Sequence, residues 1–371
     1  MRGQLAFLRE RGFEVAVAAA PGPELDAVAA AEGVRVFPVP MRRAISPISD
    51  TLGIVGLTRA IRVFGPDLVS AGTPKAGLLG MIAARVARVP ARVYVLRGLR
   101  LETVTGVRRG LLRAAERVAA SCAGTVVCVS ESLRRRALEL GLFPASKARV
   151  LGAGSSNGVD CERFRPGLRE SSEVARLHDR HALPDGAPVV GFVGRLTRDK
   201  GIEDLLAALD EVVWPRFADA RLVLVGGFET GDPVSPAVRD RLCSDERVVL
   251  SGFVADPAPY YGLMDVLAFP SRREGFPNAP LEAAASGVAV AGYATTGTVD
   301  AVVDGVTGTL VRPGARSTLG EAICAYLADG DLRRRHGESG RARAVSEFRN
   351  AIVWSEWERL YRDLLAPAGA P

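Results

Sequence analysis

The chain has 371 residues, which exceeds one ordinary hydrophobic core and predicts two domains of comparable size. Hydrophobic residues make up 48% of the chain, no apolar run is long enough to span a bilayer and no secretory signal pattern follows Met1, which predicts a soluble, cytoplasmic protein. The net charge of +6 is spread along the chain with few aromatics, which argues against nucleic acid and is compatible with a polyanionic substrate or an acidic membrane surface.

The first part of the chain alternates short β-branched runs with amphipathic stretches. This alternation predicts parallel strands covered by helices. The predicted strands are 13–19, 34–38, 67–70, 91–96, 124–130 and 148–151. A helix at 4–12 opens the chain with no strand before it, which predicts unpaired strand edges and a truncated or late start.

A polar stretch at 163–188, broken by Pro166, Pro184, Gly186 and Pro188, interrupts the alternation and predicts a linker at 167–187 between domains at 1–166 and 188–350. After it, strands are predicted at 189–193, 221–225, 248–251, 266–270 and 288–292. The final segment, 351–371, starts with the apolar spacing of a helix packed on a neighbour. The fold class is therefore α/β, with ligands expected beyond the carboxyl ends of the strands.

The strand at 189–193 runs into glycine, two cations and a predicted helix. Gly194 allows close approach of the backbone, the helix start supplies free amides, and Arg195 with Lys200 can neutralise a diphosphate. Solvated cations near a helix start are the structural alternative, which stays open for this motif taken alone.

A loop rich in Gly and Pro follows the strand at 266–270 and presents Glu274 before a helix. Amides from Asn278 to Leu281 can cap a phosphate, and Glu282, one turn in, can accept hydrogen bonds from a ribose diol. The alternative is a helix stabilised by acids near its N-terminus, but it leaves the tight turn before Asn278 unexplained. The two acids therefore predict a nucleotide-sugar site.

Together these motifs resemble the large retaining glycosyltransferase family 4, which has the GT-B fold. The resemblance rests first on Gly194-Arg195-Leu196 with Lys200-Gly201, and on Glu274 and Glu282 separated by seven residues. It extends over nearly the whole chain through Asn157-Gly158-Val159-Asp160, Val225-Gly226-Gly227, Gly252-Phe253-Val254 and Asp304-Gly305-Val306-Thr307-Gly308. It implies two Rossmann-like domains facing across a cleft, with the C-terminal helix crossing back to the first.

The resemblance also implies roles for residues of the second domain. Arg195 and Lys200 would hold the diphosphate as the leaving group in place of a metal, and Glu274 would bind the sugar hydroxyls, which makes these three residues catalytic. Glu282 would bind the ribose. The implied donor-binding residues are Gly194, Gly226, Val254, Gly275, Phe276, Asn278, Ala279, Leu281 and Glu282. The nucleotide sugar is then a co-substrate, and no cofactor is expected.

In the first domain, two loops look like acceptor-side loops of relatives that build bacterial surface polysaccharides on lipid carriers. The implied acceptor-side residues are Thr73, Lys75, Arg97 and Asn157. Many relatives carry histidine where this chain has Gly72 and Arg97, so a histidine base from this domain is excluded. A retaining transfer tolerates this, because the leaving phosphate can take the acceptor's proton. Arg97 is interpreted either as a ligand contact or as a structural arginine.

The only histidines are His178, His181 and His336, and all lie beyond the first domain. His178 and His181 have the spacing of a metal pair, but no further ligands cluster near them, so no metal site is predicted.

A basic amphipathic stretch at 108–118 offers a membrane contact. Its arginines and leucines predict either a peripheral contact with anionic lipid at the inner face of a membrane, or a surface helix whose leucines face the core.

The function predicted is the metal-independent, retaining transfer of a hexose-type sugar from a UDP- or GDP-sugar to a glycan or lipid-linked acceptor. Two alternatives are kept. An epimerase such as a UDP-N-acetylglucosamine 2-epimerase shares the architecture, although the loop from Glu274 to Glu282 argues against it. An inactive nucleotide-sugar-binding protein is favoured only by the missing first strand.

Overall fold

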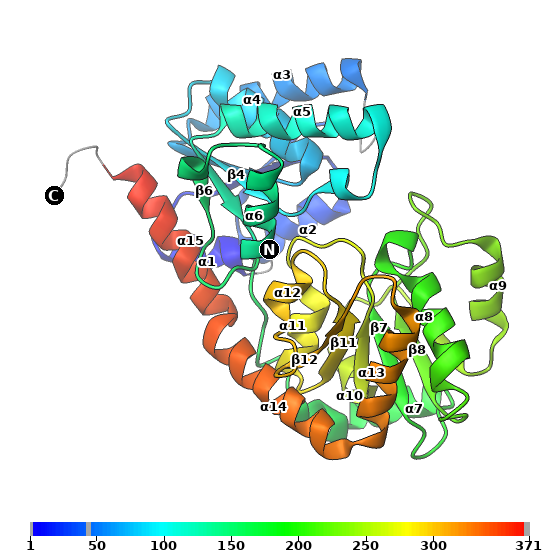
Figure 1. Cartoon of the computed structure of the whole chain (residues 1–371). Coiled ribbons are helices and arrows are strands. Elements are labelled where there is room, and N and C mark those ends of the chain that lie inside the picture. Colours follow the sequence, from blue (N-terminus) through cyan, green and yellow to red (C-terminus); the bar gives the residue numbers. More distant parts are fainter. Residues whose placement is uncertain (1–2, 42–45, 367–371) are drawn as a thin grey trace. The chain divides into compact units, whose positions relative to one another are not determined.

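The computed structural model describes residues 3–41 and 46–366. The chain forms two units, one from Met1–Asn157 with Asn350–Pro371 and the other from Gly158–Arg349. Each unit consists of parallel β-sheet flanked by helices (Figure 1). The chain therefore passes between the units twice, after Asn157 and after Arg349.

The second unit is built on one six-stranded parallel sheet with the order β12-β11-β10-β7-β8-β9. Its strands are β7 (Val189–Val193), β8 (Arg221–Val225), β9 (Val248–Gly252), β10 (Val266–Phe269), β11 (Ala289–Tyr293) and β12 (Gly308–Val311). Every residue of β10 and β11 is buried, as expected for apolar strands covered on both faces. The chain adds β8 and β9 on one side of β7, then returns to add β10 to β12 on the other. The loops after β7 and β10 are consequently neighbours where the strand order reverses, a point at which such sheets bind ligands.

Helices cover this sheet, and an apolar cluster fills the space beneath them. The helices are α7 (Ser172–Arg180), α8 (Ile202–Ala208), α9 (Pro236–Ser244), α10 (Ala258–Leu263), α11 (Asn278–Ala285), α12 (Thr298–Ala301), α13 (Arg316–Ala328) and α14 (Gly330–Glu347). α8 continues into a π-helical turn, Leu209–Val213, so the helical segment that follows the loop after β7 changes type part-way. Phe192, Leu205 and Tyr326 are fully buried members of the cluster.

The stretch at 167–187, expected to be a linker, lies within the second unit. It contains α7 and a 3-10 helix (Pro166–Glu170), and both pack against α10. Val174 and Leu177 of α7 are buried, and the hydroxyl of Ser171 accepts a hydrogen bond from the Val174 amide. Two apolar residues on one face are enough to pack this short helix against α10. The polar composition of the whole stretch does not reveal this packing.

The strands of the first unit form two parallel sheets. One sheet pairs β1 (Ala16–Ala19) with β2 (Arg35–Pro38). The other has the order β3-β4-β5-β6, formed by β3 (Leu68–Gly72), β4 (Ala91–Leu96), β5 (Thr125–Cys128) and β6 (Ala148–Arg149). Within the described residues, β1 pairs only with β2 and β3 only with β4, so each keeps one edge without a strand partner.

Seven α-helices are described in the first unit, and the last comes from the C-terminal end of the chain. They are α1 (Gln4–Glu10), α2 (Pro23–Glu32), α3 (Pro47–Phe64), α4 (Pro74–Val86), α5 (Gly106–Cys122), α6 (Glu131–Glu139) and α15 (Asn350–Leu365). The ring centroids of Trp354 on α15 and Phe7 on α1 are 5.6 Å apart, and the Tyr361 hydroxyl donates to Ser70 Oγ at 3.1 Å. The prediction that the C-terminal helix returns to the first domain is confirmed.

None of the helices in residues 3–41 and 46–366 combines the length and the apolar character that crossing a bilayer requires.

Candidate active site

Two loops meet at the carboxyl end of the second unit's sheet, one after β7 and one after β10. The backbone amide of Arg272 in the second loop donates to the carbonyl oxygen of Asp199 in the first, at 2.9 Å. Gly201 has φ of +75°, and a Cβ atom there would lie 2.1 Å from the Pro270 carbonyl oxygen. Only glycine fits this position, so the Lys200-Gly201 pair of the sequence motif is explained by the close approach of the two loops.

A third loop, after β8, lies equally close to the first. Gly226 has φ of +141°, and a Cβ atom on it would lie 1.9 Å from the carbonyl oxygen of Gly194. The Gly194 amide donates to the Val225 carbonyl at 2.9 Å, and the Leu196 amide donates to the Gly227 carbonyl at 2.9 Å. The predicted donor-binding glycines Gly194 and Gly226 are therefore packed backbone against backbone.

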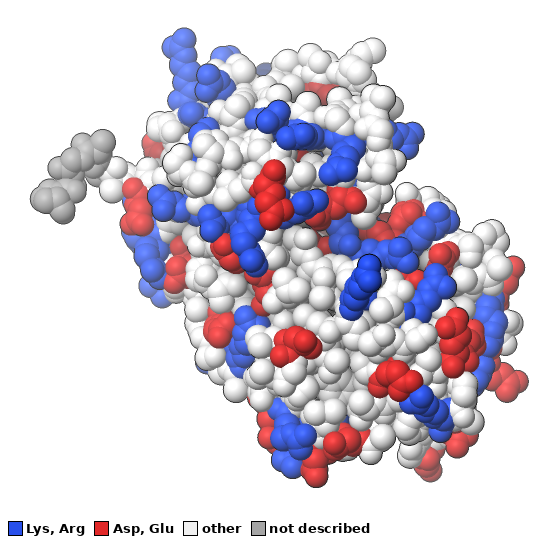
Figure 2. All heavy atoms as spheres, in the orientation of Figure 1, with Lys and Arg blue, Asp and Glu red and all other residues white. Residues whose placement is uncertain are grey.

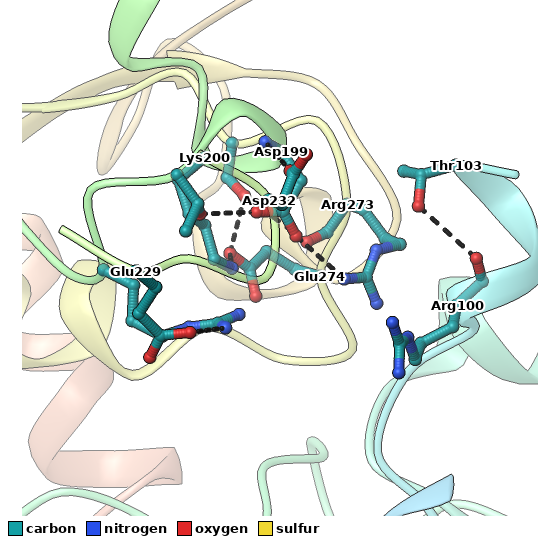
Figure 3. A network of polar contacts seen from close by, with 11 residues as sticks. Arg100, Thr103, Asp199, Lys200, Glu229, Asp232, Arg273 and Glu274 are labelled. Atoms are coloured by element: carbon teal, nitrogen blue, oxygen red, sulfur yellow. Dashed lines mark hydrogen bonds and ion pairs between the residues drawn. The ribbon is translucent and has the colours of Figure 1, made fainter. Parts of the chain in front are cut away.

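The three residues predicted to be catalytic lie on the loops after β7 and β10. Lys200 Nζ forms an ion pair with Glu274 Oε1 (Figure 3). Ser271 Oγ donates to the same oxygen at 2.7 Å. The side chains of Lys200 and Glu274 are only 14% and 13% exposed, so solvent screens this pair weakly. Arg195 Nη1 pairs with Glu229 Oε2 at 3.0 Å and is half exposed.

Asp199, beside Lys200, joins the two loops through its side chain. It accepts a hydrogen bond from Thr197 Oγ1 at 2.6 Å and from Arg273 Nη2 at 2.8 Å, and its own amide donates to Asp232 Oδ2 at 2.8 Å (Figure 3). Burial alone would raise the pKa of Asp199, but these hydrogen bonds and the positive charge of Lys200 outweigh it and lower the pKa. Asp199 is therefore held as a carboxylate between two cations.

Arg272 points away from this group and anchors the second loop to α8. Its guanidinium donates to Asp204 Oδ2 at 2.6 Å, and Arg316 Nε donates to Asp204 Oδ1 at 2.8 Å. Asp204 is 1% exposed, so it needs both cations as partners.

Glu282, the predicted ribose ligand, is oriented by a tyrosine on α10. The hydroxyl of Tyr261 donates to Glu282 Oε2 at 2.7 Å. Burial raises the pKa of Glu282, and the hydrogen bond from Tyr261 opposes this shift. In the described part of the chain, no side chain caps the start of α11, so the amides of Asn278 and Ala279 are the groups available there for a phosphate.

The other predicted donor-binding residues divide into core and surface positions. Phe276 is 8% exposed and its ring lies 5.2 Å from that of Phe348, and Leu281 is 1% exposed. These two can therefore reach a ligand only through their backbone. Gly275 is buried because the backbone of Gly297 packs on it: a Cβ atom on Gly297 would lie 2.3 Å from the Gly275 carbonyl oxygen.

At the end of β9, the predicted base-flanking residue Val254 is half-buried. The preceding residue, Phe253, is 87% exposed, although it is the bulkier apolar side chain of the two. The ring of Phe253 is therefore available to solvent beside the predicted position of the base.

Three of the predicted acceptor-side residues lie at the carboxyl ends of β3 and β4. Thr73 has φ of +78° at the start of α4, and Lys75 Nζ pairs with Asp50 Oδ1 at 2.5 Å. A Cβ atom on Gly72 would lie 2.9 Å from Arg97 Nε, so the glycine leaves the space that the guanidinium occupies. Burial lowers the pKa of Arg97, and nearby Tyr361 opposes that shift.

The fourth, Asn157, holds α15 where the chain leaves the first unit. Its Oδ1 accepts a hydrogen bond from Trp354 Nε1 at 2.9 Å, and its carbonyl oxygen accepts one from Asn350 Nδ2 at 2.9 Å. These contacts give Asn157 a structural role, and its contact with an acceptor stays a prediction.

Several residues of the site were missed by sequence reasoning. Ser271 and Arg273 lie shortly before Glu274, and Asp199 precedes Lys200, so closeness in sequence to a predicted site residue was the available signal. Tyr261 lies 21 positions before Glu282 and carried no such signal. Among the described residues, no three His, Cys, Asp or Glu side chains are placed to hold a metal ion.

Comparisons with known proteins show the family to which the chain belongs. The family model described as Glycosyl transferases group 1 matches residues 187–329, and the model of the Glycosyl transferase 4-like domain matches residues 1–154. The capsular polysaccharide biosynthesis glycosyltransferase CapM of Staphylococcus aureus is 35% identical over 98% of this chain and 94% of its own length. The UDP-Gal:alpha-D-GlcNAc-diphosphoundecaprenol alpha-1,3-galactosyltransferase of Escherichia coli is 27% identical over 69% of this chain and 65% of its own length.

Solved structures support the fold. HepE of Anabaena, in complex with UDP and glucose, matches with a TM-score of 0.79 and 21% identity over 96% of this chain and 93% of that one. WaaG, a glycosyltransferase involved in lipopolysaccharide biosynthesis, matches with a TM-score of 0.73 and 15% identity over 98% of this chain and 95% of that one. The chain thus has the GT-B fold and belongs to the glycosyltransferases, with a 4-like N-terminal domain and a group 1 C-terminal domain.

Proposed function

We propose that this glycosyltransferase moves a hexose-type sugar from a UDP- or GDP-sugar to a hydroxyl of a glycan or lipid-linked acceptor during polysaccharide biosynthesis. The observation that carries the proposal is the weakly exposed pair of Lys200 and Glu274 where the strand order reverses, with Arg195 on the same loop. The names of CapM and of the Escherichia coli galactosyltransferase support polysaccharide synthesis and a diphosphate-linked lipid acceptor. The complexes of HepE with UDP support a uridine donor.

The cations and the carboxylate of the pair take different parts of the donor. Lys200 and Arg195 hold the diphosphate and neutralise the charge that develops on it as the sugar leaves, without a metal. Glu274 accepts hydrogen bonds from the sugar hydroxyls, while Ser271 and Lys200 keep its carboxylate in place. Glu282, oriented by Tyr261, accepts hydrogen bonds from the ribose.

The transfer retains the configuration at the anomeric carbon. The acceptor hydroxyl attacks from the side on which the diphosphate departs, so the bond to the phosphate oxygen breaks and the bond to the acceptor oxygen forms on one face of the sugar. The acceptor's proton passes to the departing phosphate oxygen. This step needs no histidine base, and the chain has Gly72 and Arg97 at the two acceptor-side loops.

Arg97 and Lys75 are proposed to contact the acceptor from the first unit. Burial disfavours the charged form of Arg97, and an anionic acceptor group would favour that form. A lipid-linked acceptor would also require peripheral contact with a membrane, which is part of this proposal.

The epimerase alternative is not favoured, because the relatives include several named as glycosyltransferases, among them CapM over nearly the full chain. Measured turnover of the donor would distinguish the proposed enzyme from an inactive nucleotide-sugar-binding protein.

The test is nucleotide release from separate UDP-, GDP- and ADP-sugars, with and without saccharide or lipid-linked acceptors. Release that depends on one donor and increases with one acceptor is expected, and nuclear magnetic resonance of the product should show the anomeric configuration of the donor. An inverted product would overturn the retaining mechanism. Donor binding without release for any acceptor would favour the inactive protein.

A further inference from the structure

The outer side of α5 carries an apolar stripe that none of the elements in the described part of the chain covers. Val107, Leu111 and Val118 are 91%, 55% and 44% exposed, and exposed Ala114 lies between them. The spacing of three and four residues places all four side chains on one line along the helix. Leu111 therefore does not face the core, contrary to one of the two readings of the sequence.

The opposite side of α5 faces the core, and its side chains there are small or have a hydrogen-bond partner. Ala119 and Ala120 are buried, and buried Glu116 accepts a hydrogen bond from the hydroxyl of Tyr94 at 2.6 Å. The helix thus has two apolar sides, and only one of them is used by the fold.

The charges exposed on α5 are all positive. The exposed arginines are Arg108, Arg109, Arg113 and Arg117. Glu116 is the only acidic residue of the helix, and it is buried. Figure 2 shows Lys and Arg side chains over the part of this unit where α5 lies in Figure 1. On α5 itself, every exposed charge that accompanies the apolar stripe is therefore positive.

α3 repeats the pattern. Its exposed apolar residues are Ile48, Leu52, Val55 and Val63, between 59% and 79% exposed. Arg59 and Arg62 are exposed on the same helix, and its only acid, Asp50, is paired with Lys75. α4 packs against both α3 and α5, so the two helices belong to one layer of the first unit (Figure 1).

We propose that the exposed stripes of α5 and α3 form a docking surface for a bilayer that contains anionic lipid. Aliphatic side chains bordered by arginines match the boundary between acyl chains and anionic headgroups. A second copy of this chain would bring like charges together, and nucleic acid would leave the valines and leucines in water. Each arginine near an anionic surface strengthens binding by about fivefold at moderate salt.

This inference deepens the proposed function, because a lipid-linked acceptor would be met at such a surface. It concerns binding alone, so it can be tested with no donor or acceptor present. The probe is the full chain in flotation with vesicles of phosphatidylcholine, alone or mixed with phosphatidylglycerol. Binding to the mixed vesicles, weakened by added salt, is the expected result.

Two variants separate the apolar and the charged contributions. V107D/L111D removes the apolar side chains from the N-terminal half of the α5 stripe, and R108Q/R109Q removes two charges; each should lower binding by at least about tenfold. Arg113 and Arg117 are left intact because they donate to the carbonyl oxygens of Leu140 and Gly141. The matched control is V306D, at a valine 50% exposed in the second unit, and it should bind as the unchanged chain does.

Three outcomes would overturn the inference: no flotation with mixed vesicles, flotation independent of phosphatidylglycerol, or equal loss in V306D. Conversion of a dimer to a monomer by V107D/L111D would instead assign the stripe to a second copy. Circular dichroism of each variant shows that it is folded. Transfer to a soluble saccharide should survive V107D/L111D, so failure of docking and failure of the proposed transfer are told apart.

Discussion

Lys200 and Glu274 form an ion pair across 74 positions of sequence, joining the loops that follow two adjacent strands. One residue carries the charge needed by a diphosphate and the other the acceptor atoms needed by sugar hydroxyls. Ser271 Oγ also donates to Glu274, so the carboxylate keeps a partner when Lys200 turns to the donor. In the proposed donor site, the pair would hold both groups in place before the donor binds, which would reduce the ordering that binding requires.

Asp199 and Arg273 are predicted to position Lys200 without contacting the donor. Asp199→Asn or Arg273→Gln should each weaken donor binding by about tenfold, and the double variant should be no worse than the poorer single variant, a coupling of about 1–2 kcal/mol. Isothermal titration with the nucleotide sugar measures this cycle. The exposed pair of Arg216 and Glu321 is the control and should show a coupling near zero. If the effects of Asp199→Asn and Arg273→Gln on donor binding were additive, the proposed positioning role would be contradicted.

Gly226 is predicted to be irreplaceable, whereas its neighbour is not. Gly226→Ala places a Cβ atom against the Gly194 carbonyl oxygen at positive φ, so a loss of about 1–3 kcal/mol in stability and a clear loss of donor affinity are expected. A Cβ atom on Gly227 meets nothing within 4 Å, so Gly227→Ala should stay within about 0.5 kcal/mol of the unchanged chain. Urea unfolding and donor titration of both variants make the comparison. Equal behaviour of the two would contradict the packing described.

The hydroxyl of Tyr261 is predicted to orient Glu282 for the ribose. Tyr261→Phe keeps the buried ring but removes the hydrogen bond, so KM for the donor should rise by about tenfold. kcat should change little, because the ribose contact is equally strong before and during transfer. Tyr260→Phe is the matched control, since the Tyr260 hydroxyl contacts His181 rather than Glu282. A fall in kcat with unchanged KM in Tyr261→Phe would place this residue elsewhere in the mechanism.

Glu116 is predicted to make stability depend on pH. Burial raises its pKa to about 7, while the hydrogen bond from Tyr94 acts in the opposite direction. Because the folded chain holds the proton more tightly than the unfolded chain, the contribution of Glu116 is most favourable below pH about 4.5 and weakens by about 2–3 kcal/mol as the pH rises to about 7.

Glu116→Gln keeps an acceptor for Tyr94 and does not titrate. Its stability relative to the unchanged chain should therefore increase between pH 5 and pH 8 in urea unfolding. A constant difference across this range would show that Glu116 has an ordinary pKa in the folded chain.

The active-site loops could be predicted from sequence because each follows a short apolar strand and combines glycine with charged residues in order. Their meeting could be predicted only in part. Asp199 and Arg273 contact each other across 74 positions, and nothing local in either motif indicates that pairing. The contact of Tyr261 with Glu282 could not be predicted for the same reason, because it depends on the packing of α10 against α11.

The helical patterns show a different limit of sequence reasoning. Periodicity finds an apolar stripe but does not say whether the core or the solvent receives it. α5 has apolar residues on two sides, and the small alanines, rather than Leu111, face the core. In α7 only Val174 and Leu177 are buried, so a short docked helix has the composition of a linker.

The central claim is that Lys200 and Glu274 carry the transfer, and the most direct measurement is kcat for nucleotide release by Lys200→Ala and Glu274→Ala at saturating donor. Each should lose about 10²–10³-fold in kcat, since a group that stabilises developing charge is removed. Arg198→Ala is the matched control: this side chain lies on the same loop, is 60% exposed, and should leave kcat unchanged. Folded Lys200→Ala or Glu274→Ala proteins that bind the donor and retain full kcat would contradict the account.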